Sequence, residues 1–245
     1  MSLDSAFVSP ENKRRYVARL FSTIAPRYDL ITRVLSYGQD GRWKRRLIRE
    51  ARISPRDVVV DLACGTGDIA RLATAAGARV VLGIDLTLDM LVLAAPRAAG
   101  IRFFAGDMAA LPLRAGSADV VTTGYGLRNV PDLDVALAEI ARVLRPGGRM
   151  LSLDFNRPES RVVRACFLAY LTAVGGALGW LLHRDPDTYR YIPASIRRYP
   201  GAAGVARKLV THGFTDVRAI PLLFGLMSLH RATRSSSIDR VTTGR

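Results

Sequence analysis

Short apolar runs alternate with amphipathic stretches through the middle of the chain. The runs are typical of buried strands, and the stretches repeat apolar residues at the spacing of a helix. Strands that alternate with helices favour a parallel sheet with helices on both faces, so the pattern predicts an α/β fold. The predicted strands cover residues 58–62, 79–84, 101–105, 118–123 and 149–155, and the predicted helices cover 68–76, 88–99 and 133–144.

The two ends of the chain depart from this alternation. Residues 11–51 are predicted to be helical, because apolar residues recur on one face. Near the other end, a predicted helix over 205–212 precedes two predicted strands, 216–222 and 226–232. The connection between these strands is too short for a crossover helix. It predicts a hairpin that adds one antiparallel strand to the sheet.

A long apolar segment, residues 165–182, contains no charged residue. Its length lies at the lower limit for a membrane-spanning helix, about 18 residues. A span would place the last two strands across the bilayer from the sheet that they complete, so we reject it. Two interpretations remain: a helix buried under the sheet, and a helix that lines an apolar pocket or touches a membrane.

The first predicted strand contains a carboxylate, Asp61, near its end and is followed by a turn with Gly65 and Gly67. Glycine lets the backbone approach a ligand closely. A dinucleotide site would need a third glycine and would bind a pyrophosphate, which Asp61 would repel. The turn favours S-adenosyl-L-methionine instead, because the amino and sulfonium groups of this cofactor are positive. In the alternative interpretation, Asp61 only ends the strand and bonds its own loop.

Carboxylates also follow the second and third predicted strands, at the edge where ligands of open α/β sheets bind. Asp85 lies twenty positions beyond Gly65 and is expected to accept hydrogen bonds from both ribose hydroxyls. Asp107, with the Met108 amide beside it, is expected to face the adenine amino group. Carboxylates on three successive strands therefore predict an adenosylmethionine site.

Charge and composition indicate the setting of this site. The formal net charge is +15, and basic residues are densest before the glycine turn. This charge suits a solvated face, an anionic membrane surface, nucleic acid or an arginine-rich genome. The two cysteines and three histidines are scattered, so we expect neither a disulfide framework nor a bound metal. The first residues lack the layout of a signal peptide, which predicts a cytosolic protein.

Several motifs resemble known families. Residues 61–67, Asp85 with Met90, and residues 106–107, 111–113 and 142–148 resemble class I methyltransferases in general. More specific are Tyr-Gly-Leu-Arg-Asn-Val at 125–130 and the motifs at 21–29, 36–38 and 42–44, which resemble the quinone C-methyltransferase family of ubiquinone and menaquinone biosynthesis. Residues 153–158 and 191–200 are most similar to its phylloquinone and menaquinone members. The resemblance extends over residues 19–234.

The resemblance implies a Rossmann-like class I methyltransferase fold. The expected sheet has seven mostly parallel strands with a C-terminal antiparallel hairpin strand. The expected single domain, 1–245, has a helical lid (1–53), a cofactor core (54–155), substrate-covering helices (156–212) and a terminal hairpin (213–234). The implied cofactor-binding residues are Asp61, Ala63, Gly65, Thr66, Gly67, Asp85, Leu86, Met90, Asp107, Met108 and Gly124.

The family implies methyl transfer to a ring carbon of a prenylated quinol, of the demethylmenaquinol type. On this basis Arg128 is expected to stabilise a phenolate, Asn129 to hold a ring oxygen and Tyr28 to close the pocket. Arginine stays protonated, so a water beside Arg128 is the expected proton acceptor. In the alternative interpretation, Arg128 forms only a loop salt bridge and Asn129 only caps a turn.

Other functions stay open from the sequence. The acceptor is alternatively another lipid or a polyketide, and the charge alternatively suits an RNA-binding methyltransferase-like protein. No aromatic platform interleaves the basic residues, so we expect no nucleic acid partner. The expected partners are the prenylated quinol and a membrane surface at the inner face of the cell membrane. The sequence distinguishes neither a monomer from a homodimer nor a naphthoquinone from a benzoquinone acceptor.

Overall fold

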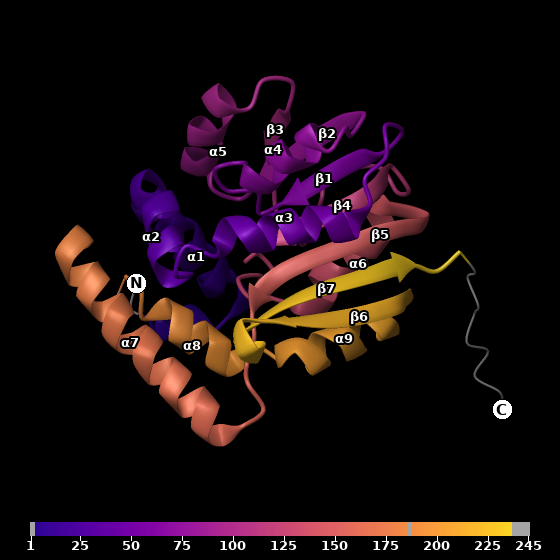
Figure 1. Cartoon of the computed structure of the whole chain (residues 1–245). Coiled ribbons are helices and arrows are strands. Elements are labelled where there is room, and N and C mark those ends of the chain that lie inside the picture. The colour runs from indigo at the N-terminus through magenta and orange to yellow at the C-terminus, as the bar shows by residue number, and fades with distance from the viewer. Residues whose placement is uncertain (1–2, 186–187, 237–245) are drawn as a thin grey trace.

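The computed structural model describes residues 3–185 and 188–236. At its centre is a seven-stranded sheet in the order β3-β2-β1-β4-β5-β7-β6 (Figure 1). Neighbours from β3 to β5 are parallel, and β7 is antiparallel to both β5 and β6, as the predicted hairpin requires. The strands are β1 (Val58–Leu62), β2 (Val80–Asp85), β3 (Arg102–Ala105), β4 (Ala118–Gly124), β5 (Leu144–Phe155), β6 (Phe214–Leu222) and β7 (Met227–Arg234).

Helices cover both faces of the sheet (Figure 1). On one face, α3 (Asp40–Ala51) and α4 (Asp68–Ala75) share an apolar cluster with Val59. On the other face, α6 (Leu133–Val143) and α9 (Gly201–Thr211) share a second cluster with Val60. Successive strand residues thus point into different clusters, which is why β1 is apolar on both sides.

The N-terminal helices lie across the edge of the sheet at which the parallel strands end. They are η1 (Ser5–Phe7), α1 (Pro10–Ile24), η2 (Ala25–Arg27) and α2 (Tyr28–Leu35). α1 begins with Pro10 in its first turn, and the Ser9 side chain accepts a hydrogen bond from the Asn12 amide, a common helix start. The Lys13 ammonium on α1 donates to the carbonyl oxygens of Arg128 and Val130, which holds the helix against the loop after β4.

The apolar segment forms α7 (Arg161–His183), which packs against α8 (Tyr191–Arg198) rather than under the sheet. The interpretation as a helix buried under the sheet is therefore wrong. In Figure 1, α7 runs along the outside of the molecule. Among the described residues, α7 is the one helix long and apolar enough to cross a membrane by length and composition. The strands β5 and β7, which flank α7 in sequence, pair with each other, so a crossing would split the sheet.

Two predicted boundaries are wrong for local reasons. β5 begins at Leu144, which pairs with Ala118, and its register shifts before Arg149 pairs with Val120. Residues 145–148, which precede the strand predicted over 149–155, are thus an irregularity inside β5. The helix after β2, α5 (Leu88–Ala94), is shorter than predicted, because Pro96 leads into a 3-10 turn, η3 (Ala95–Arg97).

Candidate active site

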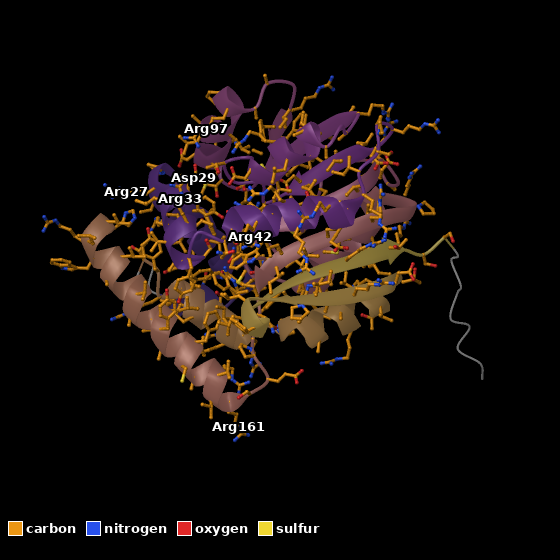
Figure 2. All side chains as sticks on the ribbon, in the orientation of Figure 1. Arg27, Asp29, Arg33, Arg42, Arg97 and Arg161 are labelled. Carbon is orange, nitrogen blue, oxygen red and sulfur yellow. The ribbon has the colours of Figure 1, made fainter. Side chains whose placement is uncertain are left out.

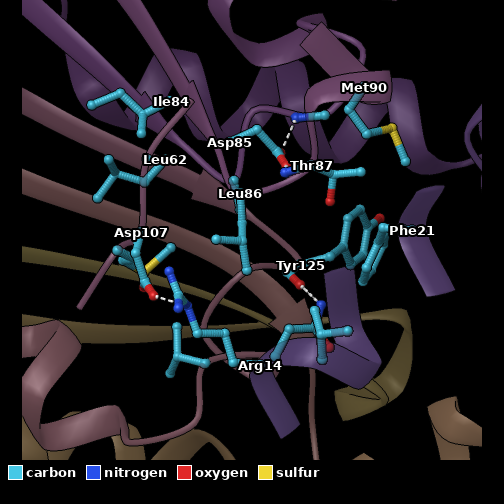
Figure 3. A pocket seen from close by; sticks show the side chains of 18 of the residues that line it. Arg14, Phe21, Leu62, Ile84, Asp85, Leu86, Thr87, Met90, Asp107 and Tyr125 are labelled. Carbon is cyan, nitrogen blue, oxygen red and sulfur yellow. Dashed lines mark hydrogen bonds and ion pairs between the residues drawn. The ribbon is translucent and has the colours of Figure 1, made fainter. Parts of the chain in front are cut away.

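A cavity of about 730 Å³, partly open to solvent, lies at the ends of the parallel strands beneath α1 (Figure 3). Its floor comes from residues at the ends of β1, β2 and β4, and its roof from α1 and the start of α2. This is the edge at which open α/β sheets bind ligands. It contains most of the predicted cofactor residues: Ala63, Gly65, Asp85, Leu86, Met90, Asp107, Met108 and Gly124.

The glycine turn after β1 is shaped by unusual backbone angles. Ala63, Gly65 and Gly67 all have positive φ, at 49°, 54° and 81°. Gly67 is the residue before α4, and a Cβ there would approach the Phe103 ring to 3.2 Å. Ala63 and Tyr125 are non-glycine residues with positive φ on the cavity wall, a conformation that side chains disfavour and that is concentrated at functional sites.

Asp85 is fixed by backbone donors at the end of β2. Its two carboxylate oxygens accept from the amides of Gly65 and Thr87, each at 2.8 Å (Figure 3). Burial raises the pKa of Asp85, whereas these amides favour its ionised form. A carboxylate oxygen has a second lone pair, so Asp85 can still accept from a ligand hydroxyl.

Asp107 lies at the far wall of the same cavity. One oxygen accepts from the Ala109 amide at 2.8 Å, and the other pairs with the guanidinium of Arg14 at 2.7 Å (Figure 3). Arg14 belongs to α1, so this ion pair joins the roof of the cavity to its wall. The expected contact of Asp107 with an adenine amino group stays a prediction.

Asp61 lies outside the lining of the cavity. Its oxygens accept from the Thr122 hydroxyl at 2.8 Å and the Ala70 amide at 3.1 Å, which ties β1 to β4 and α4. Burial raises the pKa of Asp61 to about 7. These contacts join Asp61 to the neighbouring strand and to the helix after the glycine turn, not to its own loop, and its role toward a cofactor amine stays a prediction.

Two further predicted residues also lie behind the cavity wall. Gly67 lies directly before α4, and the Thr66 hydroxyl donates to Asp29 of α2 at 2.9 Å. Conversely, sequence reasoning missed Arg14 and Val17, which line the cavity from α1. The helical pattern of α1 identifies its apolar face, but it does not identify the element that this face covers.

A second cavity, of about 630 Å³, lies between α1, α2 and α8. Its lining is mainly apolar and aromatic, with Ile24, Ile31, Leu35, Trp43, Phe155 and Ile192 among its residues. Phe21, Tyr28 and Tyr125 line both cavities, so these three rings form the partition between them. The first cavity thus contains two carboxylates, Asp85 and Asp107, and the second, on the other side of a thin aromatic wall, contains none among the described residues that line it.

Arg128 and Asn129 lie on opposite sides of this partition. Arg128 lines the second cavity and Asn129 the first, and the Arg128 Nη1 donates to the Asn129 side-chain oxygen at 3.2 Å. The Arg128 Nε pairs with Asp154 at 3.2 Å, and Nη1 also donates to the Ser195 hydroxyl. Asn129 in turn donates to the Tyr125 carbonyl at 2.7 Å. The expected salt bridge and turn contact are thus both present, and the predicted catalytic roles stay predictions.

Tyr28 and Tyr125 lie at the junction of the cavities, and polar contacts hold Tyr125 there. The Tyr125 hydroxyl donates to Asp40 at 2.7 Å, and Lys44 joins Asp40 and Asp68 at 2.6 and 2.8 Å. Burial raises the pKa of Tyr28 to about 12, so its hydroxyl stays protonated near neutral pH. Tyr28 is therefore suited to donate a hydrogen bond rather than to accept a proton.

In the described part of the chain, no three His, Cys, Asp or Glu side chains form a cluster that could hold a metal ion. His230 of β7 bonds Ser152 of β5 and the Ala202 carbonyl of α9, and His183 bonds the Tyr189 hydroxyl at the end of α7. Neither histidine lines the two cavities.

The first cavity suits adenosylmethionine by its chemistry. Asp85 offers a carboxylate to the ribose hydroxyls, and Leu86, Met90 and Met108 offer apolar surfaces for the adenine ring. A Cβ at Gly65 would stand 3.8 Å from the Tyr28 ring and would take up part of the first cavity. The cofactor therefore fits the residues present.

Comparison with known proteins agrees with this site. A model of the ubiE/COQ5 methyltransferase family matches residues 9–234. The ubiquinone/menaquinone biosynthesis C-methyltransferase UbiE of Rubrivivax gelatinosus is 37% identical, over 94% of this chain and 91% of that protein. Demethylmenaquinone methyltransferases of Mycolicibacterium gilvum and Thermus thermophilus are 37% and 38% identical, over 92% and 88% of this chain and 98% and 100% of those proteins.

Solved structures show the same fold. A SAM-dependent methyltransferase of Thermotoga maritima matches with a TM-score of 0.65 at 17% identity, over 89% of this chain and 100% of that chain. A phosphoethanolamine N-methyltransferase of Haemonchus contortus, solved with S-adenosylhomocysteine, matches with a TM-score of 0.56 at 17% identity, over 76% of this chain and 51% of that chain. The predicted class I fold is confirmed. The chain belongs to the ubiE/COQ5 methyltransferase family, and it is an S-adenosyl-L-methionine-dependent methyltransferase.

Proposed function

We propose that this enzyme methylates a ring carbon of a prenylated quinol, of the demethylmenaquinol type. The observation that carries the proposal is the second cavity, because it is apolar and shares its aromatic wall with the cofactor cavity. An acceptor ring in this cavity lies next to the cofactor without leaving an apolar environment. The names of the relatives, which are quinone-pathway methyltransferases, support the same acceptor.

A neutral hydroquinone carbon is a weak nucleophile, so the site must favour the phenolate. The ordinary pKa of a phenol is about 10, and a nearby fixed cation lowers it. Arg128 is that cation, since its guanidinium lines the second cavity and is almost completely buried. Its Nη2 donates to no acceptor among the described residues, which leaves this nitrogen for a ring oxygen.

The bound cofactor supplies an electrophilic methyl group. The ring carbon would take up this methyl group and then release its own proton, while the phenolate would take up a proton again, so one proton would leave per turnover. None of the described residues that line the second cavity is a carboxylate or an imidazole. Arg128 stays protonated, and water is therefore the proposed proton acceptor.

We propose that the other two predicted catalytic residues, Asn129 and Tyr28, position groups and exclude water. Asn129 bonds both Arg128 and the Tyr125 carbonyl, so it fixes the guanidinium relative to the partition. Asn129 itself lines the first cavity, so its predicted contact with a ring oxygen needs that oxygen to reach past the aromatic partition. Tyr28 closes the passage between the cavities and excludes water from the reacting carbon.

We also place the enzyme at the inner face of the cell membrane, because a prenylated acceptor resides in the bilayer. The net charge of +15 supports attraction to anionic lipid.

Quinone profiling of a deletion strain tests the proposed function. The strain is expected to accumulate a demethylated quinone, and the wild-type gene is expected to restore the methylated one. An Arg128→Met gene is expected not to restore it, although the variant protein still binds the cofactor. An unchanged quinone profile in the deletion strain would overturn the substrate assignment.

A further inference from the structure

α7 presents to the outside of the molecule a long face without charge. Six exposed positions recur at helical spacing along it, and all six are apolar or small: Val162, Cys166, Ala169, Ala173, Ala177 and Trp180. We call this set the α7 face. It extends over about 27 Å at 1.5 Å per residue. Val162 and Trp180, at its two ends, are 73% and 63% exposed.

An exposed face of this kind is unusual for a helix in water. A surface helix normally carries charged and polar residues on the side away from the core. The opposite side of α7 packs against the rest of the protein, because Phe167, Leu168 and Leu171 are buried with Ile196 of α8. The α7 face therefore has no apolar partner within the described part of the chain.

Arginines surround the α7 face. Arg161 and Arg164 lie at its first end and Arg184 at its last, and Arg27 donates to the Leu182 carbonyl beside that end (Figure 2). Arg33 lies on α2, on the same side of the molecule (Figure 2). None of these five arginines forms an ion pair with a carboxylate among the residues that the structure describes.

α2 extends the same apolar surface. Leu30 and Val34 lie one turn apart on α2, Tyr37 follows the end of this helix, and all three side chains are exposed. The Tyr37 ring stacks on the Tyr170 ring of α7, with centroids 5.6 Å apart, so the two helices adjoin. Apolar side chains framed by arginines are typical of helices that lie in the interface of an anionic membrane.

We propose that the α7 face docks on the anionic leaflet of a lipid bilayer, with α7 parallel to the membrane plane. A second copy of the chain is a poorer occupant. In an antiparallel pair of α7 helices Arg161 would oppose Arg184, and in a parallel pair each arginine would oppose itself. The charge that repels a second copy attracts anionic lipid headgroups.

The position of α7 connects this surface to the acceptor. Its inward residues Val174, Leu178 and Leu182 pack against the apolar cluster that contains Ile24 and Ile31, which line the second cavity. One helix thus separates the bilayer from the cavity proposed for the quinol ring. The proposed function places the enzyme at a membrane, and the α7 face is the surface that we propose for this contact. The docking proposal rests on the proposed function only for the biological purpose of the contact.

Vesicle partition of the full-length protein tests the docking surface, and it needs neither cofactor nor acceptor. The probes are vesicles of phosphatidylcholine with phosphatidylglycerol and vesicles of phosphatidylcholine alone. The wild type is expected to bind the anionic vesicles, and less so in high salt. Val162→Glu and Ala173→Glu are each expected to reduce the partition coefficient about tenfold or more, because each buries a charge in the interface.

Val210→Glu is the matched control, since Val210 is 60% exposed on α9, away from the α7 face. It is expected to leave partition unchanged. The chain has two tryptophans, and Trp43 is buried, so quenching by aqueous acrylamide reports on Trp180. Anionic vesicles are expected to protect Trp180 from the quencher.

Equal partition of Val162→Glu, Ala173→Glu and the wild type would overturn the proposal. So would a wild-type dimer that these glutamates dissociate, if neither form binds vesicles, because a second copy would then cover the face. Vesicle binding that depends on the α7 face, in an enzyme that methylates no quinol, would leave this proposal standing and overturn the proposed function.

Discussion

The guanidinium of Arg128 and the carboxylate of Asp154 form an ion pair that is almost completely removed from solvent, with 3.2 Å between Nε and Oδ1. The Asp154 carboxylate also accepts from the amides of Arg128 and Phe155. Burial raises the pKa of Asp154, while Arg128 and these amides act in the opposite direction. The pair holds the proposed catalytic cation at the wall of the second cavity.

Removing one member of this pair is expected to destabilise the fold. Asp154→Ala leaves the buried Arg128 charge without its counterion, which costs about 3–5 kcal/mol in the free energy of unfolding. Urea denaturation at neutral pH measures the change. The double variant Arg128→Met with Asp154→Leu removes both charges and is expected to lose less stability than Asp154→Ala. A larger loss in the double variant would show that packing, rather than charge, holds this region.

Cofactor affinity is expected to rise as the pH increases through 7, if Asp61 interacts with the cationic amine. The pKa of Asp61 in the folded protein is raised to about 7, so the carboxyl is largely neutral below that pH. The unfolded chain has an ordinary, lower pKa. The proton on Asp61 therefore stabilises the fold at low pH, and that contribution is lost as the pH rises to 7.

A bound cation favours the ionised carboxylate, so cofactor binding near pH 7 is expected to release a proton from Asp61. Calorimetric titration in two buffers of different ionisation enthalpy measures this release. Asp61→Asn serves as the comparison and is expected to lose that part of the pH dependence. An unchanged pH profile in the variant would show that Asp61 only ties β1 to Thr122 and Ala70.

Asp85→Ala is expected to weaken cofactor binding about 10- to 100-fold, the equivalent of losing charge-assisted hydrogen bonds to the ribose. Equilibrium binding of the cofactor measures the effect. The variant also frees the amides of Gly65 and Thr87, so its thermal unfolding must be followed in parallel. Normal affinity in a folded variant would contradict the ribose assignment.

Gly126→Ala is expected to disturb the first cavity. A Cβ at Gly126 would lie 2.3 Å from the Thr123 hydroxyl oxygen, 2.9 Å from the Ala63 Cβ and 3.1 Å from the Met108 Cε. Such overpacking costs about 1–3 kcal/mol and shifts the loop that carries Arg128 and Asn129, the proposed catalytic residues. The expected result is a higher KM for the cofactor and a lower Tm.

Gly176→Ala is the matched control for this substitution. Gly176 lies within α7, and a Cβ there meets nothing within 4 Å. Alanine in a helix interior stabilises by about 0.5–1 kcal/mol relative to glycine. The control is therefore expected to keep its KM and to gain slightly in Tm, and a lower Tm in Gly176→Ala would contradict the packing described for α7.

The parts of the fold that the sequence predicts are those that depend on local pattern. The strand run that contains Val59 and the glycine turn at Gly65 are contiguous in sequence, and both lie where they were expected. Parallel pairing then brings Asp85 and Asp107 to the same edge, which the alternation of strands and helices implies. The residues that form the floor of the first cavity were therefore predictable from the sequence.

The roof of that cavity was not predictable in the same way. Arg14 reaches Asp107 from a helix far away in sequence, and no spacing rule connects the two residues. Likewise, the apolar pattern of α7 does not distinguish a core helix from one on the surface. Its position outside the sheet depends on which elements compete for the sheet face, and α6 and α9 occupy one face of it.

The aromatic partition formed by Phe21, Tyr28 and Tyr125 has a consequence for ligand design. Since only side chains separate the two cavities, a single molecule can reach across them. An adenosine analogue joined by a short linker to an apolar ring would occupy both sites at once, and the second contact would form at high effective concentration. Such bisubstrate ligands would bind this enzyme more tightly than methyltransferases that share the glycine turn but lack an adjoining apolar cavity.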